Sequence, residues 1–169
     1  MGLNLNAPGD RVADDGTLWL DFPSQGGKSP DLPVRWDSTH VRMIRRHSLF
    51  LESNGYEWVA ASGFIGKLNL EIPLSIEPMT DTHYTVKLHF AELADLKPGE
   101  RKFNVLLQNT PVLQDFDIAA SAGGANTPLI MTFNHIHVDT SLKIDCVPSM
   151  AQAKHGPLIC GIEIIQEQQ

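Results

Sequence analysis

Paired acidic side chains are the first residues in this sequence whose spacing could do chemistry. Asp115 and Asp117 lie two residues apart, so on an extended strand both carboxylates share one face, and a glycosidase works with two carboxylates. An Asp-x-Asp pair at a strand end also suits turn capping or a solvated charge, and the sequence places no second carboxylate opposite. It contains no Gly-x-Ser-x-Gly motif and no phosphate-cradling glycine loop before a helix. We therefore predict a domain that is not an enzyme.

Two further groups of residues have the chemistry of metal ligands. His135 and His137 project the same way from a strand and can share a zinc ion, with His83, His89 or Asp117 as the third ligand from another strand. No third residue stands at a telling spacing, which favours two polar residues on the wet side of an outer strand.

The acidic turn at residues 9–16 raises a similar question for calcium. Its carboxylates, Asp10, Asp14 and Asp15, could collect a calcium ion, although Asp and Gly are also simple turn formers. We favour the turn, and we predict no bound metal and no cofactor.

Aromatic residues in a segment of small residues offer a different chemistry. Tyr56, Trp58 and Phe64 surround the small residues 60–63 and could form a platform on which the flat face of a ligand stacks. The alternative is that Trp58 and Phe64 cap the hydrophobic core.

Composition limits the partners. The chain has 169 residues, which suits one domain, and 42% hydrophobic residues, too many for a disordered chain. A net charge of −7 without a basic cluster argues against nucleic acid as a partner. No apolar run approaches the ~20 residues that span a bilayer, so we predict no membrane insertion. The first eight residues have no signal-peptide character, and the abrupt start resembles an excised domain.

The elements that must position these residues are strands. Tyr84, Val86, Leu88 and Phe90 alternate with polar residues, which is typical of a half-buried strand. We expect residues 84–118 to form a three-stranded antiparallel meander and residues 119–126 a loop without a helix. Apolar parity shifts between Phe133 and Ile136, which predicts a bulge near Asn134. The other expected strands are 17–22, 48–52, 68–76, 128–138, 141–147 and 158–165. The fold class is therefore all-β, an antiparallel β-sandwich or jelly roll.

The two cysteines leave the redox compartment open. Cys146 and Cys160 each share a strand face with apolar residues, so both are expected in the core. A hairpin of residues 141–147 and 158–165, centred near Gln152 and Ala153, would place them opposite each other. A disulfide and two inert buried thiols both fit this pattern, and buried thiols are favoured.

An ordered set of short stretches resembles the malectin-like domain, across roughly residues 65–166. The stretches are LHFAE (88–92), GERKFNV (99–105), DFDI (115–118), AGG (122–124) and GPLICGIEI (156–164). The resemblance implies a galactose-binding-like β-sandwich that binds carbohydrate without catalysis, within a larger periplasmic, cell-surface or secreted protein. It divides the chain into an N-terminal extension, 1–40, packing on the sandwich, and the malectin-like domain, 41–169, in one structural unit.

The sequence departs from the family at the sugar-binding positions. The animal lectin of this family grips a glucose disaccharide with three aromatic residues and an aspartate. The corresponding positions here fall at Ala94 and Asp95, near Gly63 beside Phe64, and near His155. Stacking on a sugar ring needs an aromatic face, so the resemblance implies the fold but not that disaccharide.

We therefore expect a non-catalytic module whose end loops bind an oligosaccharide or polysaccharide. Tyr56, Trp58 and Phe64 would stack on sugar rings. The residues expected to bond hydroxyl groups are Glu92, Asp95, Arg101 and His155. The alternative is an interaction or spacer domain that has no sugar site and packs on other domains of its parent chain.

Overall fold

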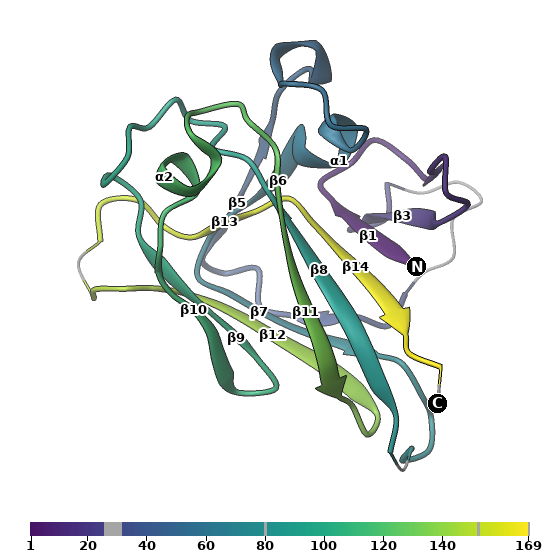
Figure 1. The fold of residues 1–169 in the computed structure, drawn as a ribbon. Coiled ribbons are helices and arrows are strands. Elements are labelled where there is room, and N and C mark those ends of the chain that lie inside the picture. Colours follow the sequence, from purple (N-terminus) through teal and green to yellow (C-terminus); the bar gives the residue numbers. More distant parts are fainter. Residues whose placement is uncertain (26–31, 80, 152, 169) are drawn as a thin grey trace.

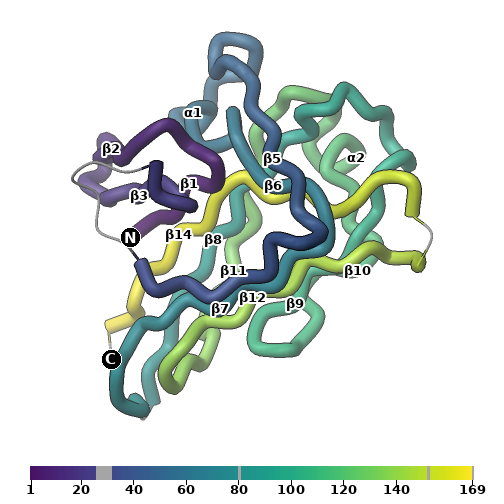
Figure 2. Tube along the Cα trace, turned by 180° about the vertical axis from the view of Figure 1, so that it is seen from behind, coloured from purple at the N-terminus to yellow at the C-terminus, as the bar shows by residue number. Residues whose placement is uncertain are grey.

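Two large sheets packed face to face dominate the structure, a computed structural model that describes residues 1–25, 32–79, 81–151 and 153–168. The six-stranded sheet has the order β11 (Leu129–His137), β8 (His83–Phe90), β14 (Gly161–Gln166), β1 (Gly2–Leu5), β3 (Leu18–Phe22), β2 (Arg11–Val12). The five-stranded sheet has the order β10 (Thr110–Phe116), β9 (Phe103–Leu107), β12 (Ser141–Pro148), β7 (Leu68–Pro73), β4 (Arg35–Trp36). The expected all-β sandwich is confirmed (Figures 1 and 2).

Smaller elements close one end of the sandwich. A three-stranded sheet has the order β13 (Leu158–Ile159), β6 (Ser62–Gly66), β5 (Val41–Arg45). The short helices are η1 (Ser48–Phe50), α1 (Glu57–Ala60) and α2 (Ile118–Ala122). None of the helices in the described ranges has the length and apolarity needed to cross a bilayer.

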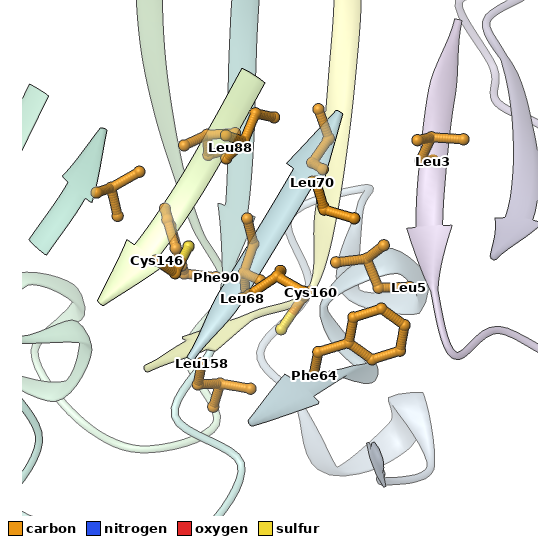
Figure 3. Close-up of a cluster of buried hydrophobic side chains, with 14 of the residues drawn as sticks. Leu3, Leu5, Phe64, Leu68, Leu70, Leu88, Phe90, Cys146, Leu158 and Cys160 are labelled. Carbon is orange, nitrogen blue, oxygen red and sulfur yellow. The ribbon is translucent and has the colours of Figure 1, made fainter. Parts of the chain in front are cut away.

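The core lies between the two large sheets. In β8 the residues that alternate inward, Val86, Leu88 and Phe90, are fully buried, as their spacing predicts. Figure 3 shows side chains from β1, β7, β8 and β12 pointing into the same interior. Phe90, Phe103 and Phe116 meet there with ring centroids 5.0–6.2 Å apart, so aromatic contacts tie β8 to the β9–β10 hairpin.

The expected three-stranded meander over residues 84–118 is wrong in its first connection. β8 pairs with β11 and β14, whereas β9 and β10 pair with each other in the opposite sheet. Residues 91–102 are too long for a tight turn and carry the chain from one sheet to the other. The second connection is a hairpin, because Gln108 and Asn109 both take positive φ angles, 50° and 64°, as a tight hairpin turn requires.

The hairpin proposed to align the two cysteines is also wrong. β12 lies in the five-stranded sheet and β14 in the six-stranded sheet, so the two segments do not pair. Of the two residues proposed as the hairpin centre, Gln152 lies outside the described residues. Cys146 and Cys160 are free and fully buried (Figure 3), and burial raises the pKa of each thiol to about 12. Both behave as small apolar core residues.

The N-terminal segment lies within the sheets rather than over them. β1 runs parallel to β3 and antiparallel to β14, and Leu3 and Leu5 are fully buried. The terminal ammonium donates to the carbonyl of Ile164 over 2.9 Å. β4 adds residues 35–36 to the edge of the other sheet. The first 40 residues, expected as an extension, thus provide strands to both layers.

Local irregularities fall partly where the sequence predicts them. The register of β11 against β8 shifts between Phe133 and Ile136, which confirms the bulge. The small residues after Asp117 form a short helix, α2, and not the expected loop, because the Asp117 carboxylate accepts from Ala120 N over 3.0 Å and caps it. Residues 48–50, expected as strand, form the single turn η1.

Replacing Leu3 with alanine tests whether β1 is part of the core. We expect Leu3→Ala to lower the free energy of unfolding by about 2–5 kcal/mol, because a fully buried leucine leaves a cavity. Leu18→Ala, a matched change at a half-exposed position, should cost far less. Urea denaturation measures both losses. A loss for Leu3→Ala as small as that for Leu18→Ala would contradict the place of β1 in the core.

Candidate functional site

An aromatic cluster lies where α1 meets the six-stranded sheet. It consists of Trp19, Tyr56, Trp58 and His89. Trp19 is fully buried and meets Trp58 edge-on with ring centroids 5.7 Å apart. Tyr56 lies 5.9 Å from Trp19 and 6.2 Å from Trp58, in the second case with the rings 30° from parallel. The buried Trp19 thus supports two half-buried rings that reach the surface.

Trp19 fits in its place because two neighbouring positions have no side chain. A Cβ atom on Gly2 would lie 2.2 Å from the Trp19 ring, and one on Gly161 would lie 3.1 Å from it and 2.4 Å from Val59. Both glycines therefore permit close packing of the indole against β1 and β14.

The segment that carries Tyr56 and Trp58 is fixed by its own hydrogen bonds. The Asn54 side chain accepts from Tyr56 N over 2.9 Å, and the Glu57 carboxylate accepts from Asn54 N over 3.2 Å. Gly55 takes φ = 84°, which favours glycine, and its carbonyl accepts from Trp58 Nε1 over 3.0 Å. The turn at Asn54 and Gly55 thus orients both aromatic rings.

Arg11 and Trp58 together separate two surface grooves. The Arg11 guanidinium lies 4.5 Å from the centroid of a Trp58 ring, a cation–π contact. The larger groove, of about 460 Å³, is lined by Asp10, Arg46, His47, Ser48 and others besides this pair. The smaller, of about 210 Å³, is lined by Asp14, Asp15 and Tyr56 among others. An aromatic ring face on largely apolar walls that also carry charged side chains suits a ligand with an apolar face and several hydroxyl groups.

The Tyr56 hydroxyl is held by an acidic neighbour. It donates to Asp15 Oδ2 over 2.8 Å, and burial together with this bond raises the pKa of Tyr56 to about 12. Asp15 also accepts from Thr17 N over 2.9 Å, while Asp10 Oδ1 accepts from Asp21 N over 3.0 Å. Asp15 therefore shapes a local turn, the use that the sequence favours over calcium, whereas Asp10 joins the start of β2 to β3.

His89 is a buried member of the aromatic cluster, and its imidazole is neutral. Its ring centroid lies 5.0 Å from that of Trp19 and 5.2 Å from that of Tyr56. Burial, with a smaller effect from Lys87, lowers the pKa of His89 to about 4. Among the residues that the structure describes, its Nε2 atom and Trp19 Nε1 are buried without a hydrogen-bond partner.

Asp95 forms a polar network at the loops that close the sandwich end. Its carboxylate pairs with the Arg46 guanidinium, and Asn126 Nδ2 donates to Asp95 Oδ1 over 3.0 Å. Arg46 Nη1 also donates to Asn126 Oδ1 over 2.8 Å. The bonds from Arg46 and then Asn126 hold the pKa of the Asp95 carboxyl below its usual value. Three loops meet in this exposed network.

Glu92 and Arg101 bond to each other and not to the surface. Both side chains are almost completely buried, with 2.7 Å between Arg101 Nε and Glu92 Oε2. Arg101 also donates to the carbonyl of Gly156, and Glu92 accepts from Ala94 N over 2.9 Å. Their expected role in bonding sugar hydroxyls is corrected: the pair joins loops from inside, because a buried charge needs a partner.

Phe64 is likewise corrected from a ligand platform to a core residue. It is 1% exposed and stacks on Trp36, with ring centroids 5.1 Å apart. His155 is half-buried beside Gly156 and lines neither groove at Trp58. Of the expected site residues, the structure brings Tyr56 and Trp58 together and places Asp95 in the adjoining network through Arg46.

Several residues of this region are not among those predicted from the sequence. Arg11 and Arg46 come from segments distant from Trp58 in the chain, and no spacing signals their approach. Trp19 shares its strand face with Thr17 and Asp21, so alternation along residues 17–22 does not identify its role. Of the two carboxylates considered for catalysis, that of Asp117 caps α2 and accepts from Gly99 N. At Asp115 the backbone N donates to Asn104 Oδ1 over 2.8 Å.

Comparison with known proteins places this geometry in context. A family model described as "Malectin domain" matches residues 73–162, just over half of the chain. No curated protein matches the chain in sequence.

Solved structures resemble the whole chain at low identity. The ANXUR2 extracellular domain from Arabidopsis thaliana has a TM-score of 0.73 and 15% identity, covering 100% of this chain and 49% of that one. The plant receptor-like kinase FER has a TM-score of 0.64 and 16% identity, covering 99% and 49%. A calcium binding mutant of Bacteroides uniformis beta-glucuronidase 2 has a TM-score of 0.66 and 10% identity, covering 99% and 18%. These likenesses establish the fold, and this chain spans about half the length of the plant receptor structures.

The buried ion pair should be far more sensitive to mutation than the exposed network. We expect Glu92→Gln to lower the free energy of unfolding by about 3 kcal/mol, because it leaves the Arg101 charge buried without compensation. Asp95→Asn, the matched change in an exposed pair, should cost much less, because water screens the pair. Urea denaturation of both variants measures the difference, and similar losses would contradict the structural role given to Glu92.

His89 predicts a loss of stability in mild acid. Between pH 6.5 and about 4 the unfolded chain binds a proton at this residue and the folded chain does not, so stability falls as pH falls through that window. We expect about 2 kcal/mol to be lost at His89 between pH 7 and 5. His89→Phe removes the titrating group, so its urea midpoint should change less over the same range. A variant as acid-sensitive as the wild type would contradict the assignment.

Proposed function

This chain belongs to the malectin family, which binds carbohydrate, and we propose that it is a non-catalytic carbohydrate-binding module whose site is the surface around Trp58. The observation that carries the proposal is the position of Trp58, on a support of buried Trp19, between two grooves whose walls combine apolar surface with charged side chains. The larger groove, of about 460 Å³, falls within the range of small-ligand sites.

The chemistry of this surface suits sugar rings. A pyranose presents C–H groups on one face and hydroxyl groups around its rim, so it needs an aromatic face flanked by hydrogen-bonding groups. Trp58 supplies the aromatic face, and Arg11, Asp10 and Ser48 are among the polar groups that flank it. The exposed Arg11 side chain covers part of the indole, so it can shift aside and turn its five donors toward the hydroxyls of a ligand.

The loops that hold aromatic residues in the family's sugar-binding lectin are built differently in this chain. Ala94 and Asp95 stand at the first two positions, and Asp95 is engaged by Arg46 and Asn126. That arrangement supports a site shifted from these loops toward Trp58, with Arg46 among the residues that line the larger groove. We therefore propose a glycan other than the family's glucose disaccharide.

The proposed module works within a larger protein. The chain spans about half of the plant receptor structures it resembles and less than a fifth of the glucuronidase structure, covering 18% of that chain. Some of those structures are described as extracellular domains. By analogy we propose a periplasmic, cell-surface or secreted location, and partners among oligosaccharides, polysaccharides and other domains of the parent chain.

A second candidate function rests on a separate observation. Leu49 and Phe50, on η1, are 85% and 72% exposed. Two adjacent large apolar side chains in contact with water favour an interaction or spacer domain whose partner covers this turn. Under this candidate the Trp58 surface binds no sugar.

A glycan titration separates the two candidates. Screening the isolated domain on a glycan array, followed by calorimetric titration of a glycan that binds, should show that Trp58→Ala weakens binding by at least about tenfold, or 1.4 kcal/mol. Phe50→Ala removes an exposed aromatic ring outside both grooves and should leave the affinity unchanged. Thermal denaturation confirms that each variant is folded.

Two outcomes would contradict the proposed site. Unchanged affinity in folded Trp58→Ala would move the sugar site elsewhere. Absence of binding across the array, together with co-purification of a partner domain that Phe50→Ala abolishes, would favour the interaction function.

A further inference from the structure

Three histidines gather on the outer face of the six-stranded sheet, and we propose that His83, His135 and His137 form a binding site for a divalent transition-metal ion of the zinc type. Strand pairing brings them together, since His137 on β11 lies directly opposite His83 on β8. Directly opposed side chains of an antiparallel pair have Cβ atoms about 5 Å apart. The pairing of β8 with β11 therefore supplies the third histidine that a His-x-His pair on one strand needs.

The β11 bulge turns the third ring to the same face. The register shift between Phe133 and Ile136 places both Asn134 and His135 opposite Thr85, on the face away from the core. His135 takes φ = 57°, the left-handed conformation that this bulge requires. The His83 ring centroid lies 5.5 Å from that of His137 and 6.3 Å from that of His135, so His83 is the central member of the group.

A carboxylate contacts one ring nitrogen of His135 and one of His137. The other nitrogen of each ring is then available to bind a metal ion. Glu167 Oε2 lies 2.7 Å from His135 Nδ1, which leaves Nε2 of that ring as the ligand atom. Asp139 Oδ1 lies 3.5 Å from His137 Nε2, which leaves Nδ1. Histidines that bind metals commonly donate their second ring N–H to a carboxylate, which fixes the ring and makes it a better ligand.

Glu167 is itself held in place. Thr85 Oγ1 donates to Glu167 Oε1 over 2.8 Å, and His135 N donates to the same oxygen over 2.9 Å. A fixed negative charge beside the three rings favours a cation.

Small ring rotations complete the site. Within the described ranges, no three His, Cys, Asp or Glu side chains already converge on a common metal position. His135 is 81% exposed and His137 51%, so their rings can turn without disturbing the core. Imidazole ligands suit Zn²⁺, Cu²⁺ and Ni²⁺, and three protein ligands leave a tetrahedral ion one position for water or a ligand oxygen.

Two of the three histidines, His135 and His137, border a groove that is separate from the proposed sugar site. His135 and His137 lie at the C-terminal end of β11. That end of the strand is at the opposite end of the sandwich from α1 (Figure 1). A groove of about 610 Å³ there is lined by His135, His137, Asp139, Gln108 and Lys143 among others. None of these residues lines the two grooves at Trp58, so metal binding and glycan binding can be tested independently.

Calorimetric titration of the untagged protein with ZnCl₂ tests the site. We expect one zinc ion per chain, bound at least tenfold more weakly by each of His83→Gln, His135→Gln and His137→Gln. His40→Gln, at an exposed histidine outside the group, is the matched control and should bind as the wild type does. Glu167→Gln removes a positioning carboxylate without removing a ligand, so it should weaken zinc binding by about 10- to 100-fold. Circular dichroism confirms that every variant is folded.

Cobalt substitution adds a readout that a purely structural role of these residues would not change. Co²⁺ in the wild-type site should give the visible absorption of a low-coordinate ion, and each of the three histidine variants should lose it. The proposal is overturned if zinc shows no saturation at one equivalent, if the histidine variants bind zinc as tightly as His40→Gln, or if only His135 and His137 contribute and His83 does not.

Discussion

Close packing around one buried indole is the constraint on which the rest of the functional surface depends. Trp19 lies against β1 and β14 only because Gly2 and Gly161 leave room for its ring. From that position it contacts Tyr56, Trp58 and His89, which come from α1 and from the centre of the six-stranded sheet. The same contacts hold the N-terminal strand in the sandwich. They also explain why the surface above Trp19 is aromatic. Framework and surface are therefore linked through a single side chain.

The amino-acid pattern predicts the framework of this fold well. Alternation along residues 84–90 identifies a strand with one buried face, and the parity shift near Asn134 identifies a real bulge. Alternation identifies the buried face of β8 and of β9, but it does not say which strands lie beside them. The 91–102 connection and the separation of Cys146 from Cys160 arise from strand order, which is decided by packing of the whole core.

The site was predictable only in part, for the same physical reason. Tyr56 and Trp58 follow an Asn-Gly turn and could be recognised locally, whereas Arg11 reaches Trp58 across 47 positions of sequence. Glu92 and Arg101 show the opposite failure: polar residue types suggested surface chemistry, yet the pair is buried and joins loops. The His135-x-His137 spacing gave half of a metal site, and strand pairing with His83 gave the other half. Residue type is thus a guide to chemistry, and burial decides whether that chemistry faces a ligand.

Indole resonances offer the most direct test of the central claim, that Trp58 is the surface on which this domain holds a sugar. The chain has three tryptophans, and they differ in environment: Trp19 is fully buried, Trp36 stacks on Phe64, and Trp58 borders both grooves. In a ¹⁵N–¹H correlation spectrum recorded during titration with a bound glycan, the account predicts that the Trp58 indole signal shifts progressively while the Trp36 signal stays in place. A titration that shifts backbone signals of Leu49 and Phe50 and leaves Trp58 unmoved would contradict it.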